Sequence, residues 1–443
     1  MTLKPIFAML VALSPVAHAA DLLAVYSEAK VQDPVFLAAQ AKLRSIQEKV
    51  PQSRSLLLPN IGLSANTTYN RFKTTLTNPG LAGLPLGGTG NYNSNGYTVS
   101  LSQPVFRLQD WIQLDEAHLQ VAAAQAQFRA AEQDLIIRVA QSYFGVLLAF
   151  DNVELVRAQK AAISEELQQA KQNFDVGTAT ITDTHEAQAR YDLVSAQEIA
   201  ALSDLEVKKR TLATLTGKMP GQLDTVNAKF EPTLPVPDNA EKWVGAALNG
   251  NPDLVGSRIL AKIAEKEVTR RRAGHLPTLS IVASYNDNSA SGGPLLDLSS
   301  RTKQSAVGLQ FNLPIFQGGA ISSQTREAAA DLEKSKDDED GARRNAELNA
   351  RQAFLGVASG MAQVKALEQA LTSSKTMLES TKLGQEVGVR TAVDVLNAQQ
   401  QLYSAKRDLY KARYDYLVSE LKLKAASGSL TDSDLEAVNR ALH

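Results

Sequence analysis

One short segment occurs twice in this chain, 211 residues apart. The copies are DVGTATITDTHEA at 175–187 and EVGVRTAVDVLNA at 386–398. In each copy a glycine, Gly177 or Gly388, can end a helix in the left-handed conformation, which glycine adopts without a Cβ penalty. Three residues later a threonine, Thr180 or Thr391, can cap the next helix. The sequence therefore predicts two helical hairpins that turn in the same way.

The duplication extends beyond the two turns. QPVF at 103–106 matches LPIF at 313–316, and Asp33-Pro34 matches Asn251-Pro252. A repeat of about 210 residues is far longer than a solenoid unit, so a whole structural half is duplicated. We therefore expect a first repeat over 21–217, a proline-containing connector over 218–250, a second repeat over 251–427 and a C-terminal segment over 428–443.

The N-terminus has the pattern of a secretory signal peptide over residues 1–20. Lys4 precedes an apolar core at 6–16, and Ala17-His18-Ala19 fits a small-residue cleavage site. The core is too short to span a bilayer. We expect cleavage before Ala20 or Asp21; the alternative is an ordinary buried N-terminal helix.

Four stretches alternate apolar with polar residues, as strands with one apolar face do. They lie near 60–70, 97–106, 277–286 and 304–313, with polar loops at 73–95 and 287–303. Each is about 10 residues long, which is enough to cross a bilayer as a tilted strand. The alternative interpretation of the four stretches is two hairpins of a soluble sheet. If they do cross, four strands cannot close a barrel without exposed edges, so at least two chains must share one.

Long proline-free segments between these strands predict four long helices. They are expected over 107–174, 181–216, 318–386 and 391–426. The first of them would be about 100 Å long. In the last, large residues such as Leu402 and Leu409 alternate at heptad spacing with Ala398, Ala405 and Ala412, which favours close helix packing. A long dimeric coiled coil is the alternative, but it does not explain the intervening strands.

Composition excludes several classes of function. The formal net charge of −1 argues against a general nucleic-acid-binding surface. The chain has no cysteine, and its five histidines are scattered without a metal-binding spacing. We therefore expect no enzymatic activity, no cofactor and no metal.

Three segments together are similar to the TolC family of outer-membrane efflux and secretion ducts. They are GHLPTLSIVAS at 274–284, VGLQFNLPIFQGG at 307–319 and the stretch from Val387 to Leu430. The resemblance implies a mixed α and β homotrimer in the outer membrane of a Gram-negative bacterium. Three chains would form one 12-stranded β-barrel, continued by a periplasmic α-helical barrel with a small mixed equatorial region.

The resemblance also implies a function. The trimer would be a passive duct that works with a periplasmic adaptor and an inner-membrane pump of the RND, ABC or MFS type. Its far end would be closed by the helical turns and opened by untwisting of the hairpins. The alternative is a periplasmic coiled-coil structural or adaptor protein without pore activity.

Residues of the closed end are implied by the same resemblance. In the family an arginine and an aspartate follow the second turn glycine, and they match Arg390 and Asp394 here. A second inward aspartate is replaced by Asn397, so Asp394 and Asn397 occupy the ring positions.

Links that would hold the two hairpins together are implied as well. Thr182 and Asp183 match the polar partners in the first hairpin, and Gln385 replaces a linking tyrosine. We expect a bond from Arg390 to Thr182 and another between Asp183 and Gln385. For the aspartates of both turns, including Asp394, plain helix capping is the alternative.

Overall fold

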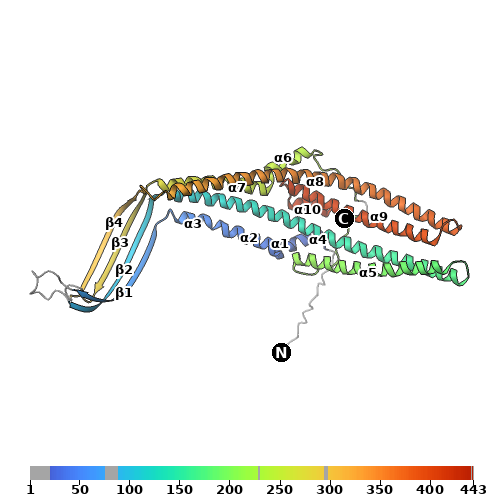
Figure 1. Cartoon of the computed structure of the whole chain (residues 1–443), viewed down its shortest axis with the longest axis horizontal. Helices are drawn as coiled ribbons and strands as arrows, with labels where there is room; N and C mark the ends of the chain where they lie inside the picture. Colours follow the sequence, from blue (N-terminus) through green and yellow to red (C-terminus); the bar gives the residue numbers. More distant parts are fainter. Residues whose placement is uncertain (1–19, 75–87, 228–229, 294–297, 441, 443) are drawn as a thin grey trace, which may run out of the picture. The chain divides into compact units, whose positions relative to one another are not determined.

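The structure is a computed structural model of one chain. It describes residues 20–74, 88–227, 230–293, 298–440 and 442 (Figure 1). Apart from Ala20, the expected signal peptide over 1–20 lies outside the described residues.

Long helices dominate the described chain, with four strands between them (Figure 1). In order, the elements are α1 (Leu22–Gln32), α2 (Pro34–Gln47), α3 (Lys49–Ser55), β1 (Asn60–Thr74), β2 (Gly88–Phe106), α4 (Leu108–Asp175), α5 (Ile181–Thr216), α6 (Ala240–Gly250), α7 (Pro252–Arg272), the 3-10 helix η2 (Ala273–His275), β3 (Thr278–Ala290), β4 (Ser300–Asn312), α8 (Ala320–Glu386), α9 (Ala392–Ala426) and α10 (Asp432–Asn439). None of the described helices is both long and apolar enough to cross a membrane.

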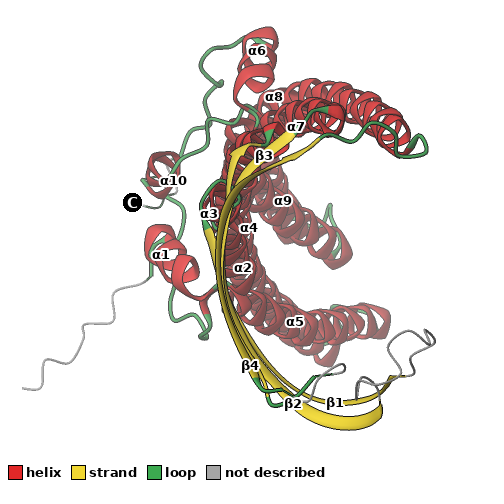
Figure 2. Cartoon of the chain, turned by 90° about the vertical axis from the view of Figure 1, so that its left-hand side faces the viewer, coloured by secondary structure: helices red, strands yellow, loops and turns green. Residues whose placement is uncertain are grey.

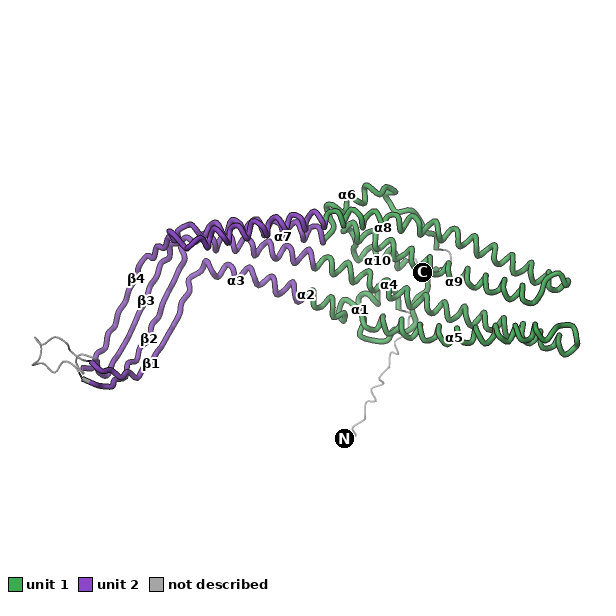
Figure 3. Tube along the Cα trace, viewed as in Figure 1, with its two compact units in different colours: residues 1–40, 128–252, 343–443 green, residues 41–127, 253–342 purple. Residues whose placement is uncertain are grey.

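Two compact units share this chain (Figure 3). Unit 1 contains residues 1–40, 128–252 and 343–443, and unit 2 contains 41–127 and 253–342. Each unit therefore takes segments from both expected repeats. Division into repeats along the sequence stays a prediction, because the units cut across it.

Unit 2 contains one antiparallel sheet in the order β1-β2-β3-β4, which Figure 2 shows as a single curved layer. Up to a register shift between Pro104 and Phe106, its pairing keeps odd-numbered residues opposite odd-numbered residues, as in the row Ile61, Leu101, Ala283 and Val307. Successive side chains of a strand point to opposite faces. Odd positions of the four strands up to that shift therefore share one face, and that face carries the expected apolar side chains.

The strands extend further into the expected loops than alternation indicates. The expected loops at 73–95 and 287–303 are shorter in the structure, because β2 begins at Gly88, β3 continues to Ala290 and β4 begins at Ser300. Asn, Ser and Gly occupy both faces of these extensions, so no apolar period marks them. Backbone pairing with a neighbouring strand continues them regardless of side chain.

The helical approach to the first strand is interrupted once. α2 ends at Gln47, and α3 begins at Lys49. Pro51 explains the break, because proline has no N–H to donate to the carbonyl four residues earlier, which is that of Gln47.

Unit 1 packs its long helices through the predicted seams. On α9 the seam residues Leu402, Leu409, Ala398, Ala405 and Ala412 are all buried. Part of this seam joins a larger core in which the ring of Phe144 on α4 stacks on that of Tyr414. The connector and the C-terminal segment add the helices α6 and α10, and Leu435 of α10 is fully buried in the same core.

Candidate functional site

The turn of the first hairpin is built by local backbone hydrogen bonds. Gly177 has a φ of 79°, in the left-handed region that a side chain would strain. The N–H of Thr178 donates to the carbonyl of Asn173 at 2.8 Å, which satisfies one of the last carbonyls of α4. Thr180 then caps α5: its Oγ1 accepts from the N–H of Asp183 at 3.3 Å, and its own N–H donates to the Asp183 carboxylate at 3.0 Å.

The turn of the second hairpin repeats this arrangement. Gly388 has a φ of 78°, and the N–H of Val389 donates to the carbonyl of Gly384 at 2.8 Å. Thr391 Oγ1 accepts from the N–H of Asp394 at 3.2 Å, and the Thr391 N–H donates to Asp394 Oδ2 at 3.0 Å. Both aspartates therefore cap helices. Both side chains are also partly exposed, so capping does not prevent them from facing a pore.

Three of the expected gate residues lie together on the second hairpin. Arg390, Asp394 and Asn397 line one groove of about 570 Å³ between the end of α8 and the start of α9. Arg390 lies against the last turn of α8, because a Cβ added to Gly384 would come within 2.7 Å of Arg390 Cγ. Gly384 therefore makes room for this arginine.

The charge of Asp394 is favoured by its surroundings. Hydrogen bonds from the backbone and side chain of Thr391 lower the pKa of the Asp394 carboxyl, and the positive charge of Arg390 lowers it further. An acid with a lowered pKa stays ionised at any pH above its ordinary value. The side chain therefore presents a permanent negative charge at this end of the hairpin.

The expected links between the hairpins are not formed within one chain. Among the described residues, Arg390 makes no hydrogen bond to Thr182, and Gln385 makes none to Asp183. In this chain Asp183 bonds to Thr180 instead. Because the structure contains one chain, links between neighbouring chains stay a prediction.

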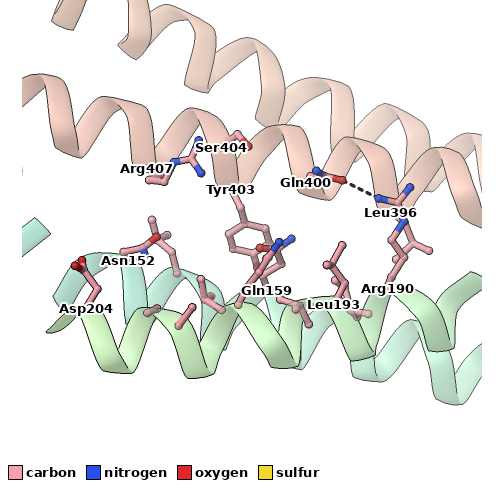
Figure 4. A pocket seen from close by; sticks show the side chains of 17 residues that line it. Asn152, Gln159, Arg190, Leu193, Asp204, Leu396, Gln400, Tyr403, Ser404 and Arg407 are labelled. Carbon is pink, nitrogen blue, oxygen red and sulfur yellow. Dashed lines mark hydrogen bonds between the residues drawn. The ribbon is translucent and has the colours of Figure 1, made fainter. Parts of the chain in front are cut away.

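A different side chain joins the two hairpins. Arg190 on α5 donates from Nη1 to Gln400 Oε1 at 2.8 Å (Figure 4). From Nη2 it donates to Asn397 Oδ1 at 3.0 Å. Residues 397 and 400 are neighbours on one helical face, so the planar guanidinium reaches both. The sequence analysis did not identify Arg190, although it is the one charged residue between Ala187 and Tyr191.

A cavity of about 440 Å³ lies beside this bridge, between the first hairpin and α9 (Figure 4). Its apolar part includes Leu396, which is buried against Val156, Ile163 and Val194 of the first hairpin. Near their turns, the hairpins of one chain therefore touch through a small apolar cluster and a few polar contacts, whereas farther from the turns they share the larger core. Such a limited contact can open at a modest cost in free energy.

Comparison with known proteins identifies the family. The chain belongs to the outer membrane efflux protein family, which it matches over residues 25–218 and 243–429. It is 34% identical over 443 residues to the outer membrane protein TolC of Vibrio cholerae serotype O1, covering 99% of this chain and 98% of that protein. It is 33% identical over 444 residues to the alkaline protease secretion protein AprF of Pseudomonas aeruginosa, covering 97% and 89%.

Solved structures show the same fold. The outer membrane channel CmeC of Campylobacter jejuni matches with a TM-score of 0.78 at 19% identity, over 95% of this chain and 90% of that one. The predicted fold class is confirmed: four strands per chain contribute to a trimeric β-barrel that continues into a helical tunnel. This protein is an outer-membrane channel of the class that serves efflux and type I secretion, which is not a class of enzymes.

Proposed function

We propose that three copies of this chain form a passive exit duct whose periplasmic end is closed by the paired helical turns. A periplasmic adaptor and an inner-membrane pump of the RND, ABC or MFS type supply docking and energy. Asp394 forms the ion-selecting ring, with the neutral Asn397 one turn deeper. Untwisting of the second hairpin against the first opens the duct.

One observation supports this proposal above the others. Two hairpins with equivalent glycine turns and capping boxes lie in one unit and, near these turns, touch through few residues. A rigid scaffold protein needs no such limited contact. The similarity to TolC and AprF covers nearly the whole of each protein, so both small molecules and secreted polypeptides are candidate cargo.

The proposal is tested by the assembly and conductance of the purified protein. In detergent, native mass spectrometry should give three chains of about 48 kDa, less the signal peptide. The same sample in a planar bilayer should give small, cation-preferring channels. A stable monomer, or a trimer that never conducts, would favour the structural coiled-coil alternative.

Arg190 is expected to help keep the duct closed. Arg190→Ala removes two hydrogen bonds between hairpins from each chain, and exposed polar contacts of this kind contribute about 0.2 to 1 kcal/mol each. Summed over three chains, the loss is at least about 1.2 kcal/mol, which should raise the ratio of open to closed channels by about sevenfold or more. Single-channel recordings measure this directly.

Arg407→Ala is the matched control for this variant. Arg407 lines the same cavity, but its described ion pair is with the adjacent Asp408 rather than with the other hairpin. Its loss should leave conductance at the parental level. Equal conductance of the Arg190 and Arg407 variants would show that the bridge does not hold the gate.

A further inference from the structure

Every charged residue of the described strands lies on the apolar face of the sheet. Arg71 and Lys73 are on β1, Asp287 is on β3, and Arg301 and Lys303 are on β4. All five have odd numbers and therefore share a face with the apolar side chains, whereas the opposite face has no charged residue on these strands. An apolar face directed at lipid is expected for a membrane barrel, so these charges lie on the lipid side.

The charges begin where the apolar band ends, at the end of the strands remote from the helices. On β1 the band starts at Ile61, and on β4 at Phe311. Ile61 lies in the row of Val307, four residues from Phe311. If the strands are tilted by about 40°, residues at the same membrane depth on β1 and β4, three strand spacings apart, differ in register by about 12 Å, or about four residues. The apolar band, which is slanted relative to the paired rows of the sheet, therefore lies parallel to the membrane plane.

A hollow of about 480 Å³ lies at the outer edge of this band. Thr67, Asn95, Ser289 and Arg301 line it, and they form one paired row across all four strands. The next row toward the membrane contains Tyr97, whose ring lies 6.1 Å from that of Tyr285. Tyrosine is typical of the membrane interface. The hollow therefore combines hydroxyl, amide and guanidinium groups, and its Arg301 end lies at the depth of lipid headgroups.

The guanidinium in this hollow is held in place by a buried acid. Arg301 donates from Nε to Asp287 Oδ1 at 2.9 Å and from Nη2 to Oδ2 at 2.8 Å, and Asp287 is only 6% exposed. Two of the five N–H groups of the guanidinium are used in this way, and the side chain of Arg301 is 64% exposed. Lys303 and Arg71 add positive charge near the same level. Three cations against one acid favour an anionic ligand.

We propose that this hollow binds the phosphate group of a lipid headgroup in the outer leaflet, with Arg301 as the ligand and Asp287 as its positioning residue. Arginine is well suited to this role, because its fork of donors matches phosphate oxygens. Lipid is the expected source of the phosphate, since the hollow borders the lipid-facing apolar band. The proposal rests on the position of the sheet in the membrane and not on the gate.

Native mass spectrometry of the detergent-purified trimer tests this binding with two matched lipids. Phosphatidic acid and diacylglycerol with the same acyl chains differ only by the phosphate. We expect phosphatidic acid to bind about tenfold more tightly, saturating at three per trimer, because a hydrogen-bonded charge pair supports such a difference. Equal binding of the two lipids would overturn the proposal. So would competition by an equal concentration of glycerol 3-phosphate, which would indicate a site for free phosphate.

Variants assign the binding to the hollow. Arg301→Gln with Asp287→Asn removes the pair without leaving a buried carboxylate alone, and it should abolish most of the preference for phosphatidic acid. Lys334→Gln with Asp338→Asn removes an exposed ion pair on α8 and should keep it. Arg71→Gln with Lys303→Gln leaves the buried pair intact and should weaken binding about threefold. If the Arg301 and Asp287 double variant and the Arg71 and Lys303 double variant both bind phosphatidic acid as the parent does, the assignment is refuted. The conductance of each sample shows separately whether the pore is intact.

Discussion

Asp394→Asn is expected to remove block of the channel by a trivalent cation applied from the periplasmic side. Three copies of Asp394 would meet around the three-fold axis, and a ring with low-dielectric walls focuses its field along the channel. Coulomb attraction between three carboxylates and a trivalent ion predicts block weakened by about a hundredfold or more. Because the pKa of Asp394 lies below its ordinary value, the parental block should persist at pH 5. Bilayer currents titrated with the cation measure both effects.

The first hairpin provides the control for this variant. Asp183 has the same capping bonds to Thr180 as Asp394 has to Thr391. Asp183→Asn therefore perturbs a helix start to the same extent without changing the proposed ring, and its amide can still hydrogen-bond Gln385 in the proposed gate link. Its blocking constant should remain within about twofold of the parent. Block that survives unchanged in the Asp394 variant would show that this aspartate is a cap only.

Arg190 should weaken the effect on block of a second acidic ring, which Asn397→Asp would create. Asn397→Asp should strengthen block, but the new carboxylate would accept charge-assisted bonds from Arg190, which now bonds Asn397. The positive charge would offset part of the added negative charge. Combining Asn397→Asp with Arg190→Gln should therefore strengthen block more than Asn397→Asp alone. This order of the two variants follows from the bridge and not from the sequence.

Local chemistry explains which features could be predicted. The turns at Gly177 and Gly388 depend on a glycine and a capping threonine within a few residues, so the sequence specifies them fully. The strands were recognisable only where one face is apolar. Beyond that band, as at Gly88–Asn95, neighbouring strands impose the structure through backbone bonds that no side-chain pattern records.

Long-range polar contacts could not be predicted in the same way. Arg190 and Asn397 are 207 residues apart, and nothing in the helical period pairs them. The resemblance to a family indicated Arg390 and Asp394, and the structure places both in one groove. The family pattern did not include Arg190, so only the packed helices bring it into view.

Replacing Arg390 and Asp183 together by alanine is expected to open the tunnel. The proposed links hold the second hairpin against the first, and each exposed polar contact contributes about 0.2 to 1 kcal/mol. With three copies per trimer, one loss would shift opening by about 0.6 to 3 kcal/mol and two losses by about twice that. A shift of this size moves a mostly closed tunnel to a largely open one. Single-channel conductance should rise for each variant and most for the double variant.

Two further variants separate gate links from helix capping. Thr180→Ala breaks the capping box but keeps Asp183, so it should not raise conductance. Gly384→Ala keeps every gate group but forces Arg390 away from the end of α8, since the added Cβ would lie 2.7 Å from Arg390 Cγ. It should therefore raise conductance as Arg390→Ala does. If the double variant conducts like the parent, or if Thr180→Ala opens the tunnel equally, Arg390 and Asp183 do not hold the gate.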